Sequence, residues 1–466
     1  MPLSWMLSSP EIEAPLDPNF KPPVLANRNY REALHAFGGG VPIVLGLEQG
    51  DGTVSRYETR IFADDHARAS SNNFYVERIL KFLLWQRGAC RVYVGGSKRV
   101  GAYLQQCYSP KGDRAFDANF MGELVYEKPF SVILCDLEDV PAANENPQAL
   151  GRHLEGCRVG FDLGGSDRKV SAVIDGEAVY SEEVVWEPAK NTNPDYHYNE
   201  VMTAIKTAAS KMPRVDAIGG SAAGVYVNNR AMVASLFRGV PKEDFHRVKD
   251  MFLRIGKEMG VPLVIVNDGE VTALAGSMSL EDNGVLGIAM GTSEAGGYVN
   301  LDGNITGWLD ELAFCPVDYN SAAPVEDWSG DIGVGATYFS QQCVFRLAPK
   351  VGFTLPTDII LAEKLKIVQE KLEAGDEGAR KIWETMGVYL GYTLAHYADF
   401  YTIKHALILG RVTSGIGGEL MLNGANHVLS KAFPELAETM HVQLPDEKSR
   451  RVGQSIAAAS LPVIPA

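Results

Sequence analysis

The sequence predicts an α/β protein in which two blocks of mixed strands and helices precede a mainly helical block. Three observations support this expectation. Apolar runs of strand length alternate with helical patterns in residues 24–150 and again in residues 157–300. Several of these strands end in glycine turns, as at Gly164-Gly165 and Gly219-Gly220. Residues 301–466 instead carry long stretches with apolar side chains at helical spacing.

The composition is that of an acidic globular protein. The chain has 466 residues, of which 46% are hydrophobic and 22% charged, so it is long enough for two or three domains. Its formal net charge of −15 disfavours nucleic-acid and anionic-membrane partners, because both carry negative charge themselves. The six cysteines show no CxxC spacing, which is typical of free thiols in a reducing compartment. No apolar run is long enough to cross a bilayer, and we expect a cytoplasmic protein.

The first predicted domain, residues 1–150, begins with an extended, Pro-rich arm. Strands are expected at 41–47, 54–62 and 90–94, with a helix at 74–87 between the second and the third. A stretch rich in Pro, Asn and Ala at 140–148 indicates a linker. We expect this domain to have a structural role or to form the contact between subunits. In the second case the protein would be a homo-oligomer.

The second predicted domain, residues 151–285, repeats that order of elements. Strands at 158–163, 170–174 and 178–186 precede a helix at 198–211 and a strand at 215–218, which again ends in Gly-Gly-Ser. The shared order indicates that the first domain is a degenerate duplicate of the second. The first copy has Glu48-Gln49-Gly50-Asp51 where the second has Asp162-Leu163-Gly164-Gly165, so the first copy has lost the chemistry of that turn.

The third predicted domain, residues 286–466, starts with a glycine hairpin and continues mainly as helices. Helices with charged outer faces are expected at 357–372 and 378–400. A strand at 406–409, a Gly-rich turn and a helix at 419–432 follow.

The turn after the strand 158–163 has the features of a phosphate loop. Backbone N–H groups of a glycine turn can approach phosphate oxygens without a side chain in the way. Asp162, at the strand end, can hold a hydrated Mg²⁺ beside them. The alternative is a tight hairpin with a surface aspartate.

The strand at 264–266 stops at Asn267-Asp268, and a helical pattern starts immediately afterwards. Open α/β sheets bind ligands at the carboxyl ends of their strands. A carboxylate there can accept the proton of a substrate hydroxyl as that hydroxyl attacks phosphorus. Helix capping is the competing explanation, because Asn and Asp are both favoured N-caps.

Two more glycine turns follow along the chain. Strands flank a turn with Gly291-Thr292, whose amides and hydroxyl suit the β- and γ-phosphates, although a plain hairpin has the same pattern. The strand at 406–409 opens into a loop with Gly410 and Gly415 that leads into a helix. Such a loop lets a flat adenine lie against backbone at a helix N-terminus, and a flexible turn is the alternative.

These four motifs, in this order, resemble the sugar-kinase, Hsp70 and actin ATPase superfamily, and within it the ROK family of sugar kinases and regulators. The resemblance covers residues 157–435 and implies a two-lobed actin-like ATPase (ribonuclease H-like) fold with an additional N-terminal α/β block. It also implies ATP and Mg²⁺ as cofactors and a small sugar-like substrate. The residues implied for cofactor binding are Asp162 (as the Mg²⁺ residue, directly or through water), Gly164, Gly165, Ser166, Lys169, Gly291, Thr292, Gly410, Gly415, Gly417 and Gly418.

For the substrate, the resemblance makes Asp268 the catalytic base, with Asn267 beside it as a sugar-hydroxyl ligand. Glu311 matches the glutamate of a Gly-Glu-x-Gly-His segment that contacts the sugar. Asn228, in the Asn-Asn pair after Gly224, is a further candidate for hydroxyl contacts, although such a pair is also a common loop element.

The chain departs from the family pattern at Ala313-Phe314, which replaces the Gly-His of that segment. The family histidine contacts the sugar and often a zinc ion, and the cysteine-rich zinc loop that normally follows is also missing. Cys315 and Cys343 do not supply four ligands, so we expect no structural zinc.

Three functions therefore stay open at this point. One is ATP-dependent phosphorylation of a sugar-like hydroxyl. Another is a catalytically impaired sugar- or nucleotide-binding regulator. The family's transcriptional members carry an N-terminal winged helix, whereas residues 1–150 have a mixed α/β pattern, so a DNA-binding repressor is disfavoured. An assembly protein on the same fold is a third possibility.

Overall fold

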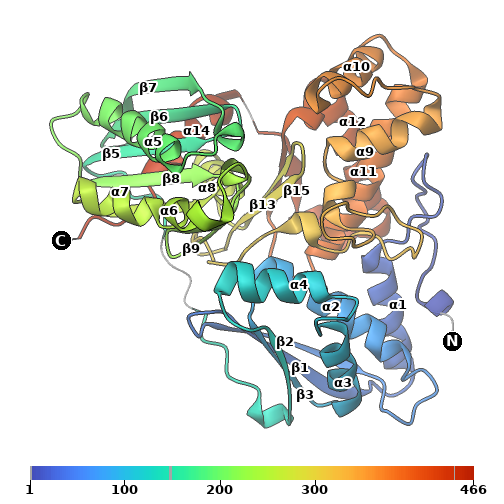
Figure 1. Ribbon diagram of the computed structural model, residues 1–466. Helices are drawn as coiled ribbons and strands as arrows, with labels where there is room; N and C mark the ends of the chain where they lie inside the picture. The colour runs from blue at the N-terminus through green and yellow to red at the C-terminus, as the bar shows by residue number, and fades with distance from the viewer. Residues whose placement is uncertain (1–2, 146–149, 446, 466) are drawn as a thin grey trace. The chain divides into compact units, whose positions relative to one another are not determined.

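The computed structural model of the chain describes residues 3–145, 150–445 and 447–465, and it confirms the predicted mixed α/β class (Figure 1). The predicted linker at 140–148 thus lies in part outside the described residues. The chain forms two compact units, each made of three segments. Unit 1 comprises Met1–Asn146, Ile288–Gly296 and Trp308–Leu444, and unit 2 comprises Pro147–Gly287, Gly297–Gly307 and Pro445–Ala466.

The N-terminal part of unit 1 is built around a four-stranded sheet in the order β2-β1-β3-β4. β1 runs antiparallel to both β2 and β3, and β3 runs parallel to β4. The elements are α1 (Pro23–Ala36), β1 (Val41–Glu48), β2 (Val54–Ile61), α2 (Ser71–Arg87), β3 (Arg91–Gly95), α3 (Lys98–Cys107), α4 (Ala115–Asn119), a π-helical turn (Phe120–Tyr126) and β4 (Ser131–Cys135).

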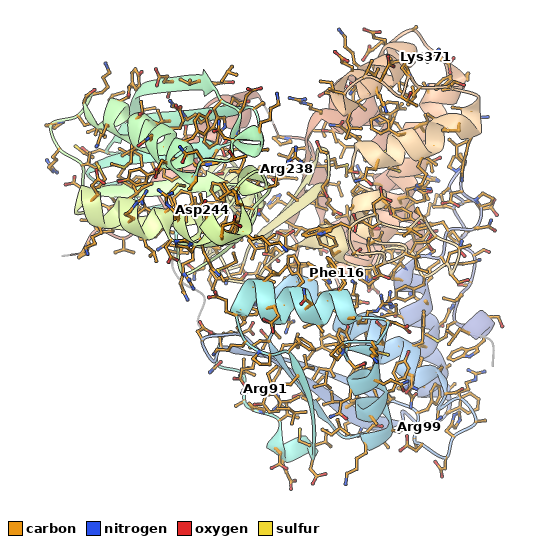
Figure 2. All side chains as sticks on the ribbon, in the orientation of Figure 1. Arg91, Arg99, Phe116, Arg238, Asp244 and Lys371 are labelled. Atoms are coloured by element: carbon orange, nitrogen blue, oxygen red, sulfur yellow. The ribbon has the colours of Figure 1, made fainter. Side chains whose placement is uncertain are left out.

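The remainder of unit 1 is mainly helical, as predicted. Its helices are α9 (Gln341–Leu347), α10 (Leu361–Glu373), α11 (Glu377–Tyr397), α12 (Ile416–Ala432) and α13 (Pro434–Thr439). α11 and α12 approach closely because glycines face each other, and a Cβ on Gly387 would lie 3.0 Å from the Cα of Gly424. Charged side chains lie on the outer faces of the helices, such as Arg99 on α3 and Lys371 on α10 (Figure 2).

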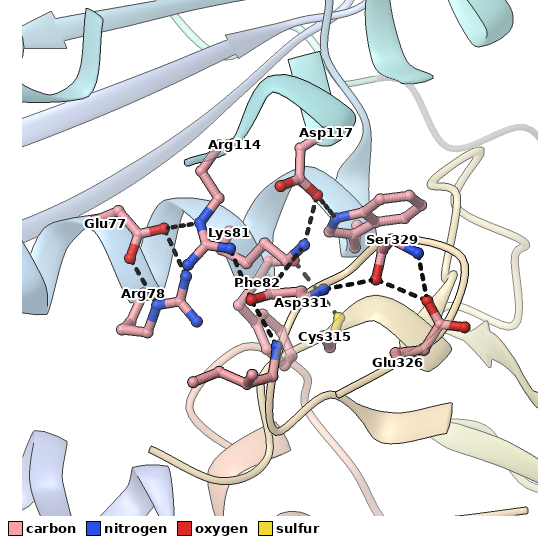
Figure 3. A network of polar contacts seen from close by, with 12 residues as sticks. Glu77, Arg78, Lys81, Phe82, Arg114, Asp117, Cys315, Glu326, Ser329 and Asp331 are labelled. Carbon is pink, nitrogen blue, oxygen red and sulfur yellow. Dashed lines mark hydrogen bonds and ion pairs between the residues drawn. The ribbon is translucent and has the colours of Figure 1, made fainter. Parts of the chain in front are cut away.

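A buried network of charges connects the N-terminal block of unit 1 with the later segment 326–331 (Figure 3). The Lys81 ammonium of α2 lies 2.5 Å from Asp117 Oδ1 and 3.0 Å from Asp331 Oδ2. Arg114 binds Asp331 at 2.7 Å and Glu77 at 2.6 Å. All five side chains are largely or fully buried, so each charge depends on its partners for stabilisation.

Unit 2 contains a five-stranded sheet in the order β11-β8-β5-β6-β7, in which β5, β8 and β11 run parallel. Alternate β5 side chains, such as Val159 and Phe161, join a core with α5 and α7. On the opposite face, Gly160 and Gly219 lie against the backbone of α14, where a Cβ would collide with Ser455 and Ala458. The elements are β5 (Cys157–Leu163), β6 (Asp167–Ile174), β7 (Glu177–Val185), α5 (Pro194–Ala209), β8 (Ala217–Ala222), β9 (Val225–Val227), β10 (Arg230–Val233), α6 (Phe245–Lys249), α7 (Met251–Met259), β11 (Leu263–Asn267), α8 (Asp268–Leu280) and α14 (Glu447–Ala459).

A further sheet has the order β13-β12-β14-β15, with β12 (Val285–Met290), β13 (Glu294–Val299), β14 (His405–Leu409) and β15 (His441–Gln443). The N-terminal sheet shares its strand order with the β6-β5-β8-β11 part of unit 2. The direction differs, because β1 is antiparallel to β3 whereas β5 is parallel to β8. The duplication of the first domain, like the predicted domain boundaries, stays a prediction.

No described helix combines the length and the low charge that a membrane crossing requires.

Candidate active site

In unit 2 the parallel strands β5, β8 and β11 bring their carboxyl ends to one edge of the sheet. The register places Asp162 of β5 beside Ser221 of β8, and Ala222 of β8 beside Asn267 of β11. Asp162 and Asp268 therefore emerge at the same edge, as their predicted roles require. The two carboxylates are so close to each other that the charge of Asp162 raises the pKa of Asp268.

Asn267, and not Asp268, is the N-cap of α8. Its Oδ1 accepts a hydrogen bond from the Gly269 amide at 2.7 Å, and its Nδ2 donates to the Gly224 carbonyl at 2.7 Å. Glu270 completes a capping box by accepting from the Asn267 amide at 3.2 Å. Capping thus accounts for Asn267 locally and leaves Asp268 in the first turn of the helix. The predicted sugar contact of Asn267 stays a prediction.

Asp268 is partly exposed, and among the described residues one of its two carboxylate oxygens accepts a hydrogen bond. The Gly269 amide donates to its Oδ1 at 3.1 Å. Burial of the carboxyl, together with the nearby negative charge of Asp162, raises the pKa of Asp268 to about 6. The side chain can therefore change its protonation state close to neutral pH.

Asp162 is held by Ser221, whose hydroxyl donates to its Oδ1 at 2.7 Å. Burial raises the pKa of Asp162, while the Ser221 hydrogen bond and the Lys169 charge act in the opposite direction. Ser221 was not among the predicted site residues. Its only signal in the sequence is the Gly-Gly-Ser end of its strand.

The turn between β5 and β6 contains one glycine that the fold itself does not require. Gly164 closes the turn, since its amide donates to Asp167 at 2.9 Å and its carbonyl accepts from the Trp186 indole at 2.8 Å. At Gly165 a Cβ would meet nothing within 4 Å, and the backbone is not left-handed. The exposed turn also carries Ser166, whose hydroxyl donates to the Asp167 carboxylate. Lys169, in the following strand β6, lies 3.7 Å from the same carboxylate.

In unit 1 the turn between β12 and β13 has a comparable glycine. The Gly291 amide donates to the Ser293 carbonyl at 3.0 Å, and the Gly291 carbonyl accepts from the Gln341 amide at 2.9 Å. A Cβ on Gly291 would meet only the Ser293 carbonyl, at an ordinary 3.6 Å. Thr292, the next residue, is exposed. Packing therefore does not explain the glycine at 291, whereas close approach of a ligand to the backbone would.

The predicted adenosine loop lies beside this turn in unit 1. Gly410 follows β14 with a left-handed φ of 103°, and a Cβ there would lie 2.4 Å from the Met290 carbonyl at the end of β12. The third and fourth motifs are thus neighbours in space. Internal contacts explain the other three glycines, because a Cβ would approach Glu373 from Gly415, the Trp383 indole from Gly417 and the Thr413 carbonyl from Gly418.

Glu311 is positioned by the C-terminal end of α2. The amides of Asp310 and Glu311 donate to the carbonyls of Gln86 and Trp85, at 2.9 and 3.0 Å. Those carbonyls belong to the last turn of α2, where the helix itself offers no donor. Asp310 has a left-handed φ of 48°, and its carboxylate accepts from the Tyr401 hydroxyl at 2.6 Å.

Asn228 and Asn229 form the two-residue turn of the β9–β10 hairpin. Their φ angles of 52° and 62° are both left-handed, as a type I′ turn requires. Asn229 also accepts a hydrogen bond from the Ile265 amide at 2.9 Å. The turn accounts for asparagine at both positions, and a substrate contact of Asn228 stays a prediction.

The sequence matches no protein-family model and no curated protein. Among solved structures, the ROK hexokinase from Thermus thermophilus aligns over 66% of this chain and 97% of its own, with a TM-score of 0.52 and 19% sequence identity. The chain has a ROK sugar-kinase-like fold. At this identity the likeness establishes the fold alone, and it confirms the predicted ROK resemblance and actin-like ATPase fold class.

Other matching structures include a ROK family glucokinase from Streptomyces griseus in complex with glucose and AMPPNP, at 20% identity and a TM-score of 0.45. It covers 64% of this chain and 98% of its own. A ROK family transcriptional regulator, a homologue of the E. coli MLC protein, has 16% identity and a TM-score of 0.46. It covers 65% of this chain and 78% of its own.

Phe314, where the predicted ROK pattern would place a histidine, is a packed residue. Phe314 is only 7% exposed, and its ring centroid lies 4.3 Å from that of Trp85 in α2. The N-terminal block of unit 1 thus supplies the surface against which this residue packs. In the part of the chain that the structure describes, no cluster of three His, Cys, Asp or Glu residues is arranged for a metal ion. The expectation of no zinc stays a prediction.

Glu294, the first residue of β13, is a buried acid that the sequence analysis did not single out. Neither of its carboxyl oxygens has a hydrogen-bond partner of normal geometry among the described residues. Burial, and then the charge of Glu311, raise the pKa of Glu294 to about 8, which the nearby Tyr397 hydroxyl offsets only in part. Glu294 is therefore neutral at pH 7. Its position inside a glycine-rich strand gave no signal of this environment.

Proposed function

We propose that the protein is an ATP-dependent phosphotransferase that acts on a hydroxyl of a sugar or sugar-like substrate. The observation that supports this most directly is the pair of carboxylates at the carboxyl edge of the unit 2 sheet. Asp268 is partly exposed there with a pKa of about 6, and Asp162 emerges beside it. A base with such a pKa is ionised at neutral pH and can still accept a proton in the transition state.

Each predicted residue has a defined task in this proposal. Oδ1 of Asp268 accepts from the Gly269 amide, which leaves Oδ2 to take the proton of the substrate hydroxyl. The hydroxyl oxygen forms a bond to phosphorus while the bond from phosphorus to the leaving oxygen breaks. ATP would supply the phosphoryl group, and Asp162, whose Oδ1 accepts from the Ser221 hydroxyl, would hold the Mg²⁺ that neutralises phosphate charge.

The glycine turns would hold the nucleotide. Within the described residues the fold gives no packing reason for glycine at positions 165 and 291, whereas close approach of phosphate to the backbone gives one. Gly164 and Ser166 belong to the first turn, Lys169 to the strand β6 that follows it, and Thr292 to the second turn. Gly410, Gly415, Gly417 and Gly418 shape the loop proposed for adenosine, and Glu311, Asn267 and Asn228 are proposed for the substrate.

Replacing Asp268 by Asn tests the assignment. We expect turnover to fall by about 10²- to 10⁴-fold, because the amide cannot accept the proton. The matched control is Asp175→Asn, in the turn between β6 and β7, where Asp175 accepts only from the Gly156 amide at 2.8 Å. The control should retain wild-type turnover. Full activity in the Asp268→Asn variant would remove Asp268 from the role of base.

The second candidate function is a sugar- or nucleotide-binding regulator without turnover. The apolar Phe314 in place of the family histidine favours it, because a polar substrate contact is lost. Release of ADP from ATP and Mg²⁺ in the presence of a panel of sugars distinguishes the two functions. Nucleotide binding without sugar-stimulated ADP release would support the regulator.

A further inference from the structure

Aromatic side chains gather next to Glu311 in unit 1. The Trp328 ring meets Phe116, Phe120 and Phe314 nearly edge-on, with centroids 5.4, 5.6 and 5.6 Å away. Trp85 lies beneath Phe314 at 4.3 Å. We call Trp85, Phe116, Phe120, Phe314 and Trp328 the aromatic platform.

The outer part of the platform faces solvent. Trp328 is 55% exposed, Phe116 is half-buried, and the other three rings are buried. Figure 2 labels Phe116 on the short helix α4. An exposed apolar residue alone is ordinary at a protein surface. Trp328 differs because the other packed rings of the platform support it. Its aromatic face is therefore presented at a fixed place.

The turn that carries Trp328 is rigid. One Glu326 carboxylate oxygen accepts from the Trp328 amide at 3.1 Å, and the other accepts from both the amide and the hydroxyl of Ser329 at 2.7 Å. The Glu326 amide in turn donates to the Asp331 carbonyl at 2.8 Å. The Asp331 carboxylate is fixed by Lys81 and Arg114 of the buried charge network (Figure 3). A binding group on such a turn loses little conformational freedom when a ligand docks.

The platform continues directly from the proposed substrate residue. Glu311 and Phe314 are joined by a single 3-10 turn, in which the Phe314 amide donates to the Glu311 carbonyl at 3.2 Å. Side chains three residues apart lie above one another in such a turn. The Glu311 amide also donates to the carbonyl of Trp85, a member of the platform, at 3.0 Å, so backbone hydrogen bonds tie Glu311 to the platform at both places.

We propose that the acceptor carries a second ring beyond the one that bears the reacting hydroxyl, and that this ring stacks on Trp328 with Phe116 at its edge, because the two aromatic rings stand at 78° to each other. This inference rests on the proposed function, because it assumes that Glu311 contacts the sugar. The C–H face of a pyranose and the face of an aryl group are both apolar, which suits an exposed indole supported from behind. The substrate class is thus a disaccharide or an aryl glycoside, and a free monosaccharide fills only part of the site.

Binding measured by calorimetry without ATP tests the platform independently of turnover. The ligands are glucose, maltose and 4-nitrophenyl glucoside, and the proteins are full-length wild type, Trp328→Ala, Trp328→Phe and Phe116→Ala. We expect the two-ring ligands to bind wild type about tenfold more tightly than glucose. Trp328→Ala and Phe116→Ala should lose most of that advantage without changing the glucose affinity, and Trp328→Phe should retain much of it.

The matched control is Phe37→Ala, which removes another exposed aromatic ring of unit 1 (58% exposed) outside the platform. It should leave all three affinities unchanged. In turnover assays Trp328→Ala should raise KM for the two-ring acceptors and leave kcat unaltered, because a stacking contact to the second ring is made equally in the ground state and in the transition state.

Equal affinity of wild type for one-ring and two-ring ligands, or no binding of either two-ring ligand, would overturn the proposal. A Trp328→Ala variant that changes only the sedimentation of the protein would also overturn it, and would assign the platform to a contact between copies of this chain. If the calorimetric difference holds but the Asp268→Asn variant keeps full activity, the assigned base is wrong and the platform stands. If turnover depends on Asp268 but the ring preference is missing, the platform alone is wrong.

Discussion

Asp268 makes a specific prediction about pH at the scale of a single residue. A general base must be ionised, and burial together with the charge of Asp162 raises the pKa of Asp268 to about 6. The value of kcat/KM should therefore be constant at pH 7–8 and should fall about tenfold per pH unit well below pH 6. A pH profile of kcat/KM from 5 to 8 measures this, with Asp175→Asn as a variant that should follow wild type. A profile that stays flat down to pH 5 would contradict the assignment.

Glu294 predicts a pH dependence of stability. Its pKa is about 8 in the folded protein and has the ordinary value of 4.5 when the chain is unfolded. Between these values the unfolded state releases a proton that the folded state keeps, so the free energy of unfolding must decrease as the pH rises from 4.5 to 8. The decrease is at most about 1.4 kcal/mol per pH unit.

The variant Glu294→Gln removes this titration while keeping the shape of the side chain. Urea unfolding of both proteins at pH 5, 6, 7 and 8 should show wild type losing stability relative to the variant with each step. Parallel stability profiles would mean that Glu294 is ionised in the folded protein.

Site residues at the ends of predicted strands could be predicted from the sequence, whereas their buried partners could not. Asp162 and Asp268 follow apolar runs directly, and the register of the parallel strands brings both to one edge. Ser221 and Glu294 lie within strands, and only the packed structure shows what surrounds them. Phe314 was predicted to be a departure from the family pattern, but its packing against Trp85 depends on a segment more than two hundred positions earlier in the chain.

At the scale of an element, two glycines of predicted loops should respond differently to substitution. Gly165→Ala places a Cβ in open space and should leave stability unchanged while weakening ATP binding, because the methyl group occupies the proposed path of a phosphate. Gly417→Ala places a Cβ 2.4 Å from the Trp383 indole nitrogen, which donates to the Val412 carbonyl. It should cost about 1–3 kcal/mol of stability. Thermal unfolding and equilibrium ATP binding of both variants compare the two effects. An undisturbed ATP affinity in Gly165→Ala would argue against the first phosphate loop.

Helices with strong end signals were predicted within a few residues, and other elements were missed for identifiable reasons. α11 (Glu377–Tyr397) and α12 (Ile416–Ala432) match the expected 378–400 and 419–432, because charged faces and a glycine start mark them. The hairpin of β9 and β10 was missed, since its strands are short and its turn has Asn-Asn in place of a glycine pair. α1 begins at Pro23, where only the end of an extended arm was expected.

At the scale of the molecule, the buried charge network makes the N-terminal block part of the stability of unit 1. Lys81 pairs with both Asp117 and Asp331, and it is fully buried. Burial alone would raise the pKa of Asp331, but the cations of Lys81, Arg78 and Arg114 hold that pKa well below its usual range. Removing one cation leaves carboxylates uncompensated inside the protein.

We therefore expect Lys81→Met to lower the free energy of unfolding by about 3–5 kcal/mol. The matched control is Lys366→Met, which breaks an exposed pair with Glu370 on α10 and should change stability by less than about 0.5 kcal/mol. Chemical denaturation of the full chain measures both. A small effect of Lys81→Met would mean that the network contributes little to stability.

The end of α2 gives the N-terminal block a further significance. The carbonyls of Gln86 and Trp85 accept from the amides of Asp310 and Glu311, so a backbone link anchors the proposed sugar-binding segment to the last turn of α2. An amino-acid substitution changes a side chain but keeps the main-chain carbonyl that makes such a link. Substitutions of the Trp85 or Gln86 side chain would thus leave the link in place, whereas a change that unwinds the last turn of α2 would release the Leu309–Phe314 segment.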